Sequence, residues 1–360
     1  MKKLAVLFPL LLFTLSAQAQ RKSIKGTVVE KETGKPLPSA SVYISQTTIG
    51  VLTDVDGKFE IKDISRGDYV LVVSMLGFKT FTQPVSDFDK PIFIELEENE
   101  IMLDEIVITS KESRRWYRNL ERFEEELIGQ TRNANSTKIL NPKALFFENK
   151  PDTLIAFIGE PLEIENRALG YHITFHLTDF VLTNEIASID GYATYKELEP
   201  ESESQENGWI RERERAYTGS FTHFIHSLFS NQLQKDGYQL FYTKNTAIFS
   251  DEILSFNRVP SPRSIYKHRP GMDTIELFND KSPLIRVEYT GEPSEPRIMD
   301  KMKLKRGLPQ FSWIHLPNDN KAIIDIRSGK EVTQYRSQLI GYWGLTSRLA
   351  DLLPNNYKFN

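Results

Sequence analysis

The sequence predicts a small all-β sandwich followed by a helix and a sheet-rich α+β domain. Short alternating apolar runs, separated by Gly, Pro and Asp, fill residues 24–96, which is the pattern of an antiparallel sandwich. A helical period replaces the two-residue period between residues 111 and 131. From Ala144 onward the two-residue period returns, interrupted by a helix that we expect Ser220 to cap.

Composition narrows the class of protein. A chain of 360 residues predicts about two domains. The net charge of −4 offers no global basic field, so we expect no nucleic-acid partner. The absence of cysteine excludes disulfides, thiolate metal sites, a cysteine nucleophile and a lipid anchor on an N-terminal cysteine.

The first residues have the pattern of a signal peptide, which we assign to residues 1–19. Lys2 and Lys3 precede an apolar run over residues 4–15, which is shorter than a membrane span requires. Ala17 and Ala19 place small residues at both recognition positions of a cleavage site. We therefore expect export, to the periplasm or the outer membrane or as a secreted protein, with no transmembrane helix in the mature chain.

The strands of the first domain, residues 21–97, follow from alternation and turn residues. Gly34, Pro36 and Pro38 interrupt the pattern after the first strand. Asp54 and Gly57 predict a tight turn rather than a calcium loop, because the first ligand position of such a loop would be a leucine. The expected strands cover residues 24–29, 40–45, 50–53, 58–61, 69–75, 80–85 and 92–96.

This domain resembles the carboxypeptidase regulatory-like (CarboxypepD_reg-like) family, whose fold is a transthyretin/Ig-like sandwich. The matching segments are Gly26-Thr27-Val28, Gly34-Lys35-Pro36-Leu37-Pro38, Ala40-Ser41-Val42, Thr53 to Phe59, Gly67-Asp68-Tyr69 and Gly77-Phe78, and residues 103–109 resemble the tail that follows such domains in TonB-dependent outer-membrane receptors of Gram-negative envelopes. The resemblance implies a non-catalytic module. Such receptors continue for several hundred further residues, so we expect this chain not to be one of them.

Residues 98–132 are predicted to be a linker and an amphipathic helix. Trp116, Leu120, Phe123 and Leu127 form one apolar stripe, which we expect to dock on the second domain. Arginines precede a group of glutamates around this stripe. The glutamates argue against a membrane-surface helix, which would carry basic residues without them.

Residues 133–360 are predicted to be an α+β domain of unknown function. Its clearest strand covers residues 170–182, and we expect residues 197–208 to be an exposed acidic loop. The segments 166–171, 215–220 and 223–225 are similar to those of other exported proteins that join this kind of sandwich to a second half, and this resemblance implies no activity.

Histidine and serine patterns indicate no metal, cofactor or catalytic residue. His172 and His176 lie in a predicted strand, where they are about 13 Å apart and cannot share one metal ion. His223 and His226 are close on a helix, but a third ligand is not identifiable. Ser220 lacks the second glycine of a nucleophile elbow, and the sequence has no phosphate-binding or dinucleotide motif.

The three alternating arginines Arg211, Arg213 and Arg215 are the candidate binding residues. On a strand they would share one face and could bind carboxylates, phosphates or acidic glycans. The alternative is ordinary pairing with neighbouring acids.

The function predicted from the sequence is that of a non-catalytic envelope protein that binds a protein or a glycan. The alternative is a hydrolase whose active site lies in the second domain, where scattered carboxylates could form a catalytic pair.

Overall fold

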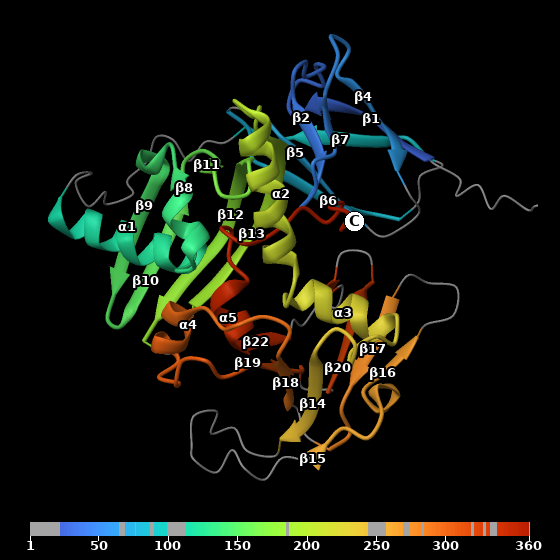
Figure 1. The fold of residues 1–360 in the computed structure, drawn as a ribbon. Helices are drawn as coiled ribbons and strands as arrows, with labels where there is room; N and C mark the ends of the chain where they lie inside the picture. Colours follow the sequence, from blue (N-terminus) through green and yellow to red (C-terminus); the bar gives the residue numbers. More distant parts are fainter. Residues whose placement is uncertain are drawn as a thin grey trace, which may run out of the picture.

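The computed structural model of the chain describes residues 22–64, 69–75, 77–86, 90–98, 113–184, 187–243, 257–268, 274–281, 284–317, 320–326, 329–331 and 337–359. Buried apolar side chains gather in three large clusters, one for each of three successive regions. We call these regions the sandwich (22–98), the middle sheet (113–197) and the distal region (221–346). Figure 1 shows them in blue, green and mainly orange to red, respectively.

The sandwich consists of two facing sheets, as the sequence predicts, but the pairing is not antiparallel throughout, because β1 and β7 are parallel. Its strands are β1 (Lys22–Glu30), β2 (Ser41–Ile44), β3 (Gly50–Leu52), β4 (Lys58–Ile64), β5 (Tyr69–Ser74), β6 (Phe81–Val85) and β7 (Ile92–Leu96). One sheet has the order β4-β1-β7 and the other the order β3-β2-β5-β6. Val28, Val42, Leu71 and Ile94 are completely buried between them, so alternation along each strand supplies the core.

The predicted turn between β3 and β4 is present. The Asp54 carboxylate accepts hydrogen bonds from the backbone N–H groups of Asp56 and Lys58, at 2.9 and 2.8 Å. Gly57 has a φ of +70°, and a Cβ there would lie 2.4 Å from the carbonyl oxygen of Val28. The aspartate and the glycine therefore serve the turn itself.

The middle sheet has six strands covered on one face by a helix. The elements are α1 (Arg114–Leu127), a 3-10 helix (Arg132–Ser136), β8 (Thr137–Ile139), a 3-10 helix (Pro142–Ala144), β9 (Leu145–Lys150), β10 (Thr153–Ile158), β11 (Leu162–Asn166), β12 (Tyr171–Thr183) and β13 (Ala187–Glu197). The order is β8-β11-β12-β10-β9, and β13 pairs with the opposite edge of β12. The long strand β12 therefore organises the whole sheet.

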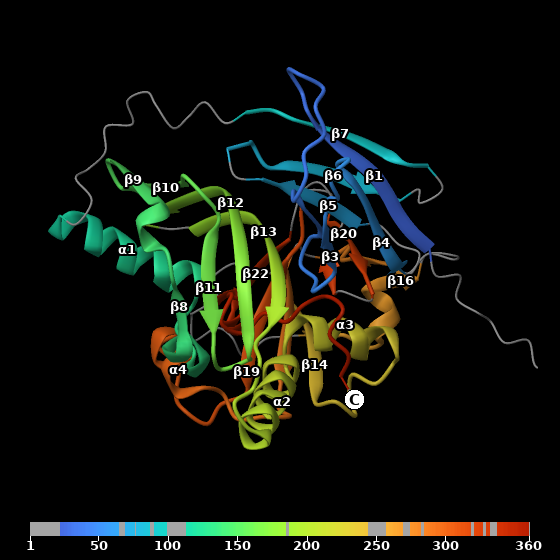
Figure 2. The same cartoon turned by 90° about the horizontal axis from the view of Figure 1, so that it is seen from above.

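Helix α1 docks on this sheet through its apolar stripe, which confirms the prediction from its period. Ser113 caps the helix, since its hydroxyl accepts a hydrogen bond from the N–H of Trp116 at 3.1 Å. The Trp116 indole donates to the carbonyl of Leu145 at 3.4 Å, and the Phe123 ring lies 4.7 Å from that of Phe180. Figure 2 shows α1 at one side of the molecule, with its first turns projecting beyond the strands.

The sandwich is joined to the edge of β13 by backbone hydrogen bonds. The N–H of Gln46 donates to the carbonyl of Ala193 at 2.6 Å, and the N–H of Tyr195 donates to that of Thr47 at 3.0 Å. The N–H of Asn355 also donates to the carbonyl of Gln46 at 2.7 Å. These bonds cover the edge of β13 and fix the position of the sandwich.

The distal region has two sheets with an apolar core between them and α3. Its elements are α3 (Phe221–Phe229), β14 (Tyr238–Thr243), β15 (Asn257–Arg258), a 3-10 helix (Pro262–Ser264), β16 (Tyr266–His268), β17 (Thr274–Phe278), β18 (Leu284–Tyr289), α4 (Pro296–Lys301), β19 (Gln310–His315), β20 (Lys321–Asp325), β21 (Lys330–Glu331), β22 (Gln338–Gly341) and α5 (Tyr342–Thr346). The sheet orders are β15-β14-β18-β19-β22 and β16-β17-β20-β21. Ser220 caps α3 as predicted, by accepting a hydrogen bond from the N–H of His223 at 3.1 Å.

The segment that contains the three alternating arginines is a helix, α2 (Glu203–Tyr217), and not a strand. The prediction of a loop over residues 197–208 is also wrong for its second half. Ser202 caps the helix, and Glu203 and Glu206 lie in its first turn, where acids favour a helix. The alternating charges suggested a period of two, but the buried side chains, Trp209 and Arg213, are four residues apart.

Candidate functional site

Arg213 is a structural residue of α2. Its guanidinium is buried, donates to the carbonyls of Leu169 and Gly170 at 2.7 and 3.3 Å, and lies 4.1 Å from the centre of the Tyr171 ring. Gly170 has a φ of +71°, and a Cβ there would lie 2.3 Å from Trp209. Arg213 therefore holds the turn before β12 against α2, and it lines neither of the two cavities described below.

Arg211 and Arg215 lie on a different side of α2 from Arg213, so the three arginines share no common face. Arg211 is exposed. Arg215 donates to the Glu212 carboxylate at 3.0 Å and to the Asn133 side-chain oxygen at 3.3 Å. Glu212 also pairs with Arg132. Of the three predicted binding residues, Arg215 is the one that the fold brings to a cavity.

This cavity, which we call the junction cleft, lies where the middle sheet, α2 and the distal region meet. Its volume is about 470 Å³. Its polar lining includes Thr131, Arg132, Arg215, Thr218, Ser220, Glu292, Ser294, Glu295, Gln310, Tyr342, Ser347 and Asp351. Both charge signs and several hydroxyl groups are therefore present in one space of the size of a small-molecule site.

Two carboxyl groups in the junction cleft have raised pKa values. Burial raises the pKa of Asp351 to about 6, although hydrogen bonds from Thr131 and Asn133, at 2.6 and 2.9 Å, stabilise its charged form. Burial also raises the pKa of Glu292, and the positive charges of Arg215 and Arg132 oppose this effect. Asp351 is thus committed to internal hydrogen bonds, whereas Glu292 faces two arginines.

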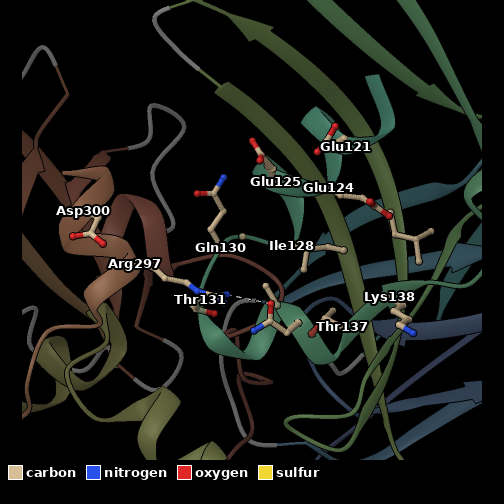
Figure 3. Close-up of a pocket in the computed structure, with 14 residues that line it drawn as sticks. Glu121, Glu124, Glu125, Ile128, Gln130, Thr131, Thr137, Lys138, Arg297 and Asp300 are labelled. Carbon is tan, nitrogen blue, oxygen red and sulfur yellow. Dashed lines mark hydrogen bonds between the residues drawn. The ribbon is translucent and has the colours of Figure 1, made fainter. Parts of the chain in front are cut away.

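A second cavity, the α1 groove, has a volume of about 750 Å³ and shares Thr131 with the junction cleft. Figure 3 shows Glu121, Glu124 and Glu125 from the second half of α1 along one side and Arg297 and Asp300 from α4 along the other. Burial, and then the charge of Glu121, raise the pKa of Glu124. The groove is therefore mainly acidic.

His172 and His176 lie on β12, and His223 and His226 lie on α3, as the sequence predicted. Among the described residues, no group of three or more His, Asp or Glu side chains is suited to a metal. His172 pairs with Glu163 at 2.6 Å, while His176 is buried beneath the sandwich, 3.2 Å from the Thr80 hydroxyl. On α3, His226 bonds the Tyr217 hydroxyl at 2.6 Å, and His223 bonds that of Tyr238 at 3.0 Å. These contacts are structural.

The sequence did not indicate the junction cleft. Its charged residues are Arg132, Arg215, Glu292, Glu295 and Asp351, which lie on four segments far apart in the chain. No short motif joins them, so no spacing rule could have found them. The alternating arginines were the only partial signal. They include Arg215, although the sequence predicted a strand for them and the structure has a helix.

None of the helices in the described part of the chain combines the length and the apolar character that crossing a membrane would require. This finding concerns helices alone.

Comparison with known proteins identifies the first region. Residues 24–108 match the family described as CarboxypepD_reg-like domain, which confirms the resemblance seen in the sequence. The TonB-dependent receptor SusC of Bacteroides thetaiotaomicron is 33% identical over 107 residues, which cover 30% of this chain and 10% of the receptor. The TonB-dependent receptor P3 of Formosa agariphila is 31% identical over 100 residues, covering 28% and 10%. The matched region thus spans about a tenth of these relatives.

Solved structures resemble the chain only distantly. A Bacteroides fragilis protein of unknown function has 15% identity and a TM-score of 0.18, with coverage of 44% of this chain and 64% of that one. A Bacteroides uniformis protein proposed to bind carbohydrate has 12% identity and a TM-score of 0.17, with coverage of 49% and 78%. These scores are too low to indicate a shared overall fold.

Proposed function

We propose, on the premise that residues 24–108 form a CarboxypepD_reg-like domain, that the protein is a non-catalytic binding protein whose ligand is a glycan held in the junction cleft. The non-catalytic part of this proposal is supported by the sandwich, which the family resemblance implies to be a non-catalytic module. The glycan-binding part rests on the chemistry of the cleft.

The observation that carries the proposal is the mixed, prearranged lining of the cleft. Arg132 and Arg215 are both held by Glu212, and Arg132 also donates its backbone N–H to Glu295 at 2.6 Å. Their remaining N–H groups can donate hydrogen bonds to a ligand, and the Glu292 carboxylate can accept them. Sugar hydroxyl groups both donate and accept, so they can satisfy a lining of this kind without bringing a charge into it.

The location that we propose is the periplasm or the outer membrane of a Gram-negative envelope. The pattern of residues 1–19 supports export, and the similarity of the first region to TonB-dependent receptors supports an envelope protein. A protein in the periplasm or at the outer membrane would encounter the glycans that enter or line the envelope.

The substitution Glu292→Gln tests the binding site. Calorimetric titration with a panel of short neutral oligosaccharides should identify a ligand, and Glu292→Gln should raise its Kd about tenfold, because a hydrogen bond to a charged acceptor is lost. The side chain keeps its shape, so folding should be unaffected. Glu148→Gln on β9, whose side chain is 49% exposed, is the matched control and should bind normally. No binding by any oligosaccharide, or equal binding by both variants, would contradict the proposal.

A hydrolase in the same cleft is the second candidate. Burial raises the pKa of both Asp351 and Glu292, and a carboxyl group with a raised pKa is suited to general acid catalysis. The same oligosaccharides, incubated with the protein, would then yield new reducing ends. Loss of this product in Asp351→Asn and in Glu292→Gln would replace binding by catalysis as the function.

A further inference from the structure

We propose that the first half of α1 is a docking surface for anionic lipid headgroups. Four arginines occupy its exposed side: Arg114, Arg115, Arg118 and Arg122. Tyr117, which is 55% exposed, lies among them. We call these five residues the α1 basic surface. It is separate from the junction cleft, so this inference does not depend on the proposed glycan site.

The glutamates of α1 lie in its second half, from Glu121 onward, and residues 114–120 contain no acid. Glu121, Glu124 and Glu125 line the α1 groove, as Figure 3 shows. Glu126 pairs with Arg348 at 3.4 Å. The sequence argued against a membrane-surface helix because glutamates follow the arginines. Glu121 and Glu125 are exposed next to Arg122, but residues 114–120 carry the other three arginines and no acid, so the first two turns keep a positive charge.

The arginines contribute little to the fold. Within the described part of the chain, none of the four takes part in an ion pair, a hydrogen bond or a ring contact. The buried side of the same helix, with Trp116 and Phe123, is sufficient to dock it on the middle sheet. Four guanidinium groups held in solvent on one ordered helix are therefore available for an external partner.

A lipid surface suits this geometry better than a shaped protein partner. Residues 114–122 extend over about 12 Å of helix, so the arginines can reach several headgroups at once. Helix α1 lies at the margin of the molecule in both views of the fold (Figures 1 and 2). Arginine forks bind phosphates in pairs of hydrogen bonds, and a tyrosine with one polar end is suited to the lipid–water boundary.

The negative charge of the whole chain makes this contact orientation-specific. The net charge is −4, so an anionic surface repels most of the molecule. At physiological ionic strength charges are screened over about 8 Å, so only the residues nearest the surface decide the outcome. Lipid contact through α1 would then fix which way the sandwich and the junction cleft face.

Co-sedimentation with vesicles tests the inference. The mature chain that begins at Gln20 is used, because apolar residues 4–15 would themselves enter a bilayer. At about 50 mM salt we expect binding to vesicles of phosphatidylglycerol and phosphatidylcholine, and at about 500 mM salt only weak binding. Vesicles of phosphatidylcholine alone should not bind the protein. Replacement of all four arginines by glutamine should lower the partition coefficient roughly 100-fold.

The matched control removes the same charge from the sandwich. Lys25, Lys58, Lys62 and Lys79 are exposed, with side-chain accessibilities of 58, 63, 72 and 52%, and their replacement by glutamine should leave vesicle binding within about twofold of the unmodified protein. Equal losses in both variants, or absence of binding at low salt, would overturn the inference. Arginine-dependent binding to soluble polyglutamate but not to vesicles would also overturn it, in favour of an acidic protein partner.

Discussion

At the scale of single residues, His176 is a buried histidine in the contact between the sandwich and the middle sheet. It lies beneath the sandwich, with its ring 5.7 Å from that of Tyr43 and a ring nitrogen 3.2 Å from the Thr80 hydroxyl. Burial lowers the pKa of His176 from 6.5 to about 4. Its neutral form is therefore part of the contact between sandwich and middle sheet.

His176 should make the folded protein less stable in acid. The unfolded chain takes up a proton near pH 6.5 and the folded chain only near pH 4, so stability falls as the pH drops between these values. The loss from this residue between pH 7.5 and pH 5 should be roughly 2 kcal/mol. In His176→Gln, which cannot titrate, urea unfolding should show that much less loss than in the unmodified protein.

The unmodified protein and His176→Gln must be compared at the same two pH values, because Asp351 changes the stability of the fold in the opposite direction. Its folded pKa of about 6 is above the ordinary value of 3.8, so its penalty for folding is relieved as the pH falls. An identical pH dependence for the unmodified protein and His176→Gln would show that the pKa of His176 is the same in the folded and the unfolded chain, and would contradict the prediction.

At the scale of elements, α1 has its charges in the unfavourable order. Its first turn carries no acid and its last turn no base, whereas the positive end of the helix dipole favours acids and the negative end favours bases. Arg114 and Arg115 therefore weaken the helix slightly, and Glu125 and Glu126 do the same at the other end.

Replacing Arg114 and Arg115 by glutamate should stabilise the protein. Acids in the first turn interact favourably with the helix dipole, so we expect a gain of about 1 kcal/mol in the free energy of unfolding at low salt. Urea unfolding measures it. The gain should shrink in 1 M salt, where such interactions are screened. Arg122→Glu, far from the first turn, should give no comparable gain, and a similar gain there would point to general charge repulsion instead.

The elements also show where sequence reasoning succeeds. The sandwich and α1 were predictable because each is built from neighbouring residues whose period, turns and cap are local. Helix α2 was mistaken because its charges alternate, while its decisive contacts, those of Trp209 and Arg213 with the turn at Gly170, come from a distant segment. The junction cleft was not predictable for the same reason, because long-range packing alone brings Arg132 and Asp351 together.

At the scale of the whole molecule, the middle sheet is completed by residues 349–351. The N–H groups of Leu349 and Ala350 donate to the carbonyls of Leu127 and Ile128, both at 3.1 Å. The buried Asn166 side chain donates to the carbonyl of Ala350 at 3.0 Å. Its side-chain oxygen accepts hydrogen bonds from the backbone N–H groups of Ala168 and Leu169. One side chain thus ties two segments nearly two hundred residues apart.

Asn166→Ala should destabilise the protein by about 2–4 kcal/mol, because buried carbonyl and N–H groups lose their partner. Urea unfolding should report the loss, and hydrogen exchange should show faster exchange at Leu349 and Ala350. Asn356→Ala, which removes an exposed pair of hydrogen bonds to Thr48, is the comparison and should cost less than 1 kcal/mol. Equal losses of stability in Asn166→Ala and Asn356→Ala would mean that the buried hydrogen bonds of Asn166 stabilise the fold no more than the exposed pair does.

The attachment of residues 349–351 also has a consequence for the order of folding. The sandwich is contiguous in sequence and can form as soon as residues 22–98 are available. The middle sheet cannot complete its core until a segment more than 150 residues beyond its last strand has arrived. Closure of a loop of that length slows folding. During synthesis or export, the unfinished sheet would expose its apolar face, so we expect this interval to be when the chain most needs a chaperone.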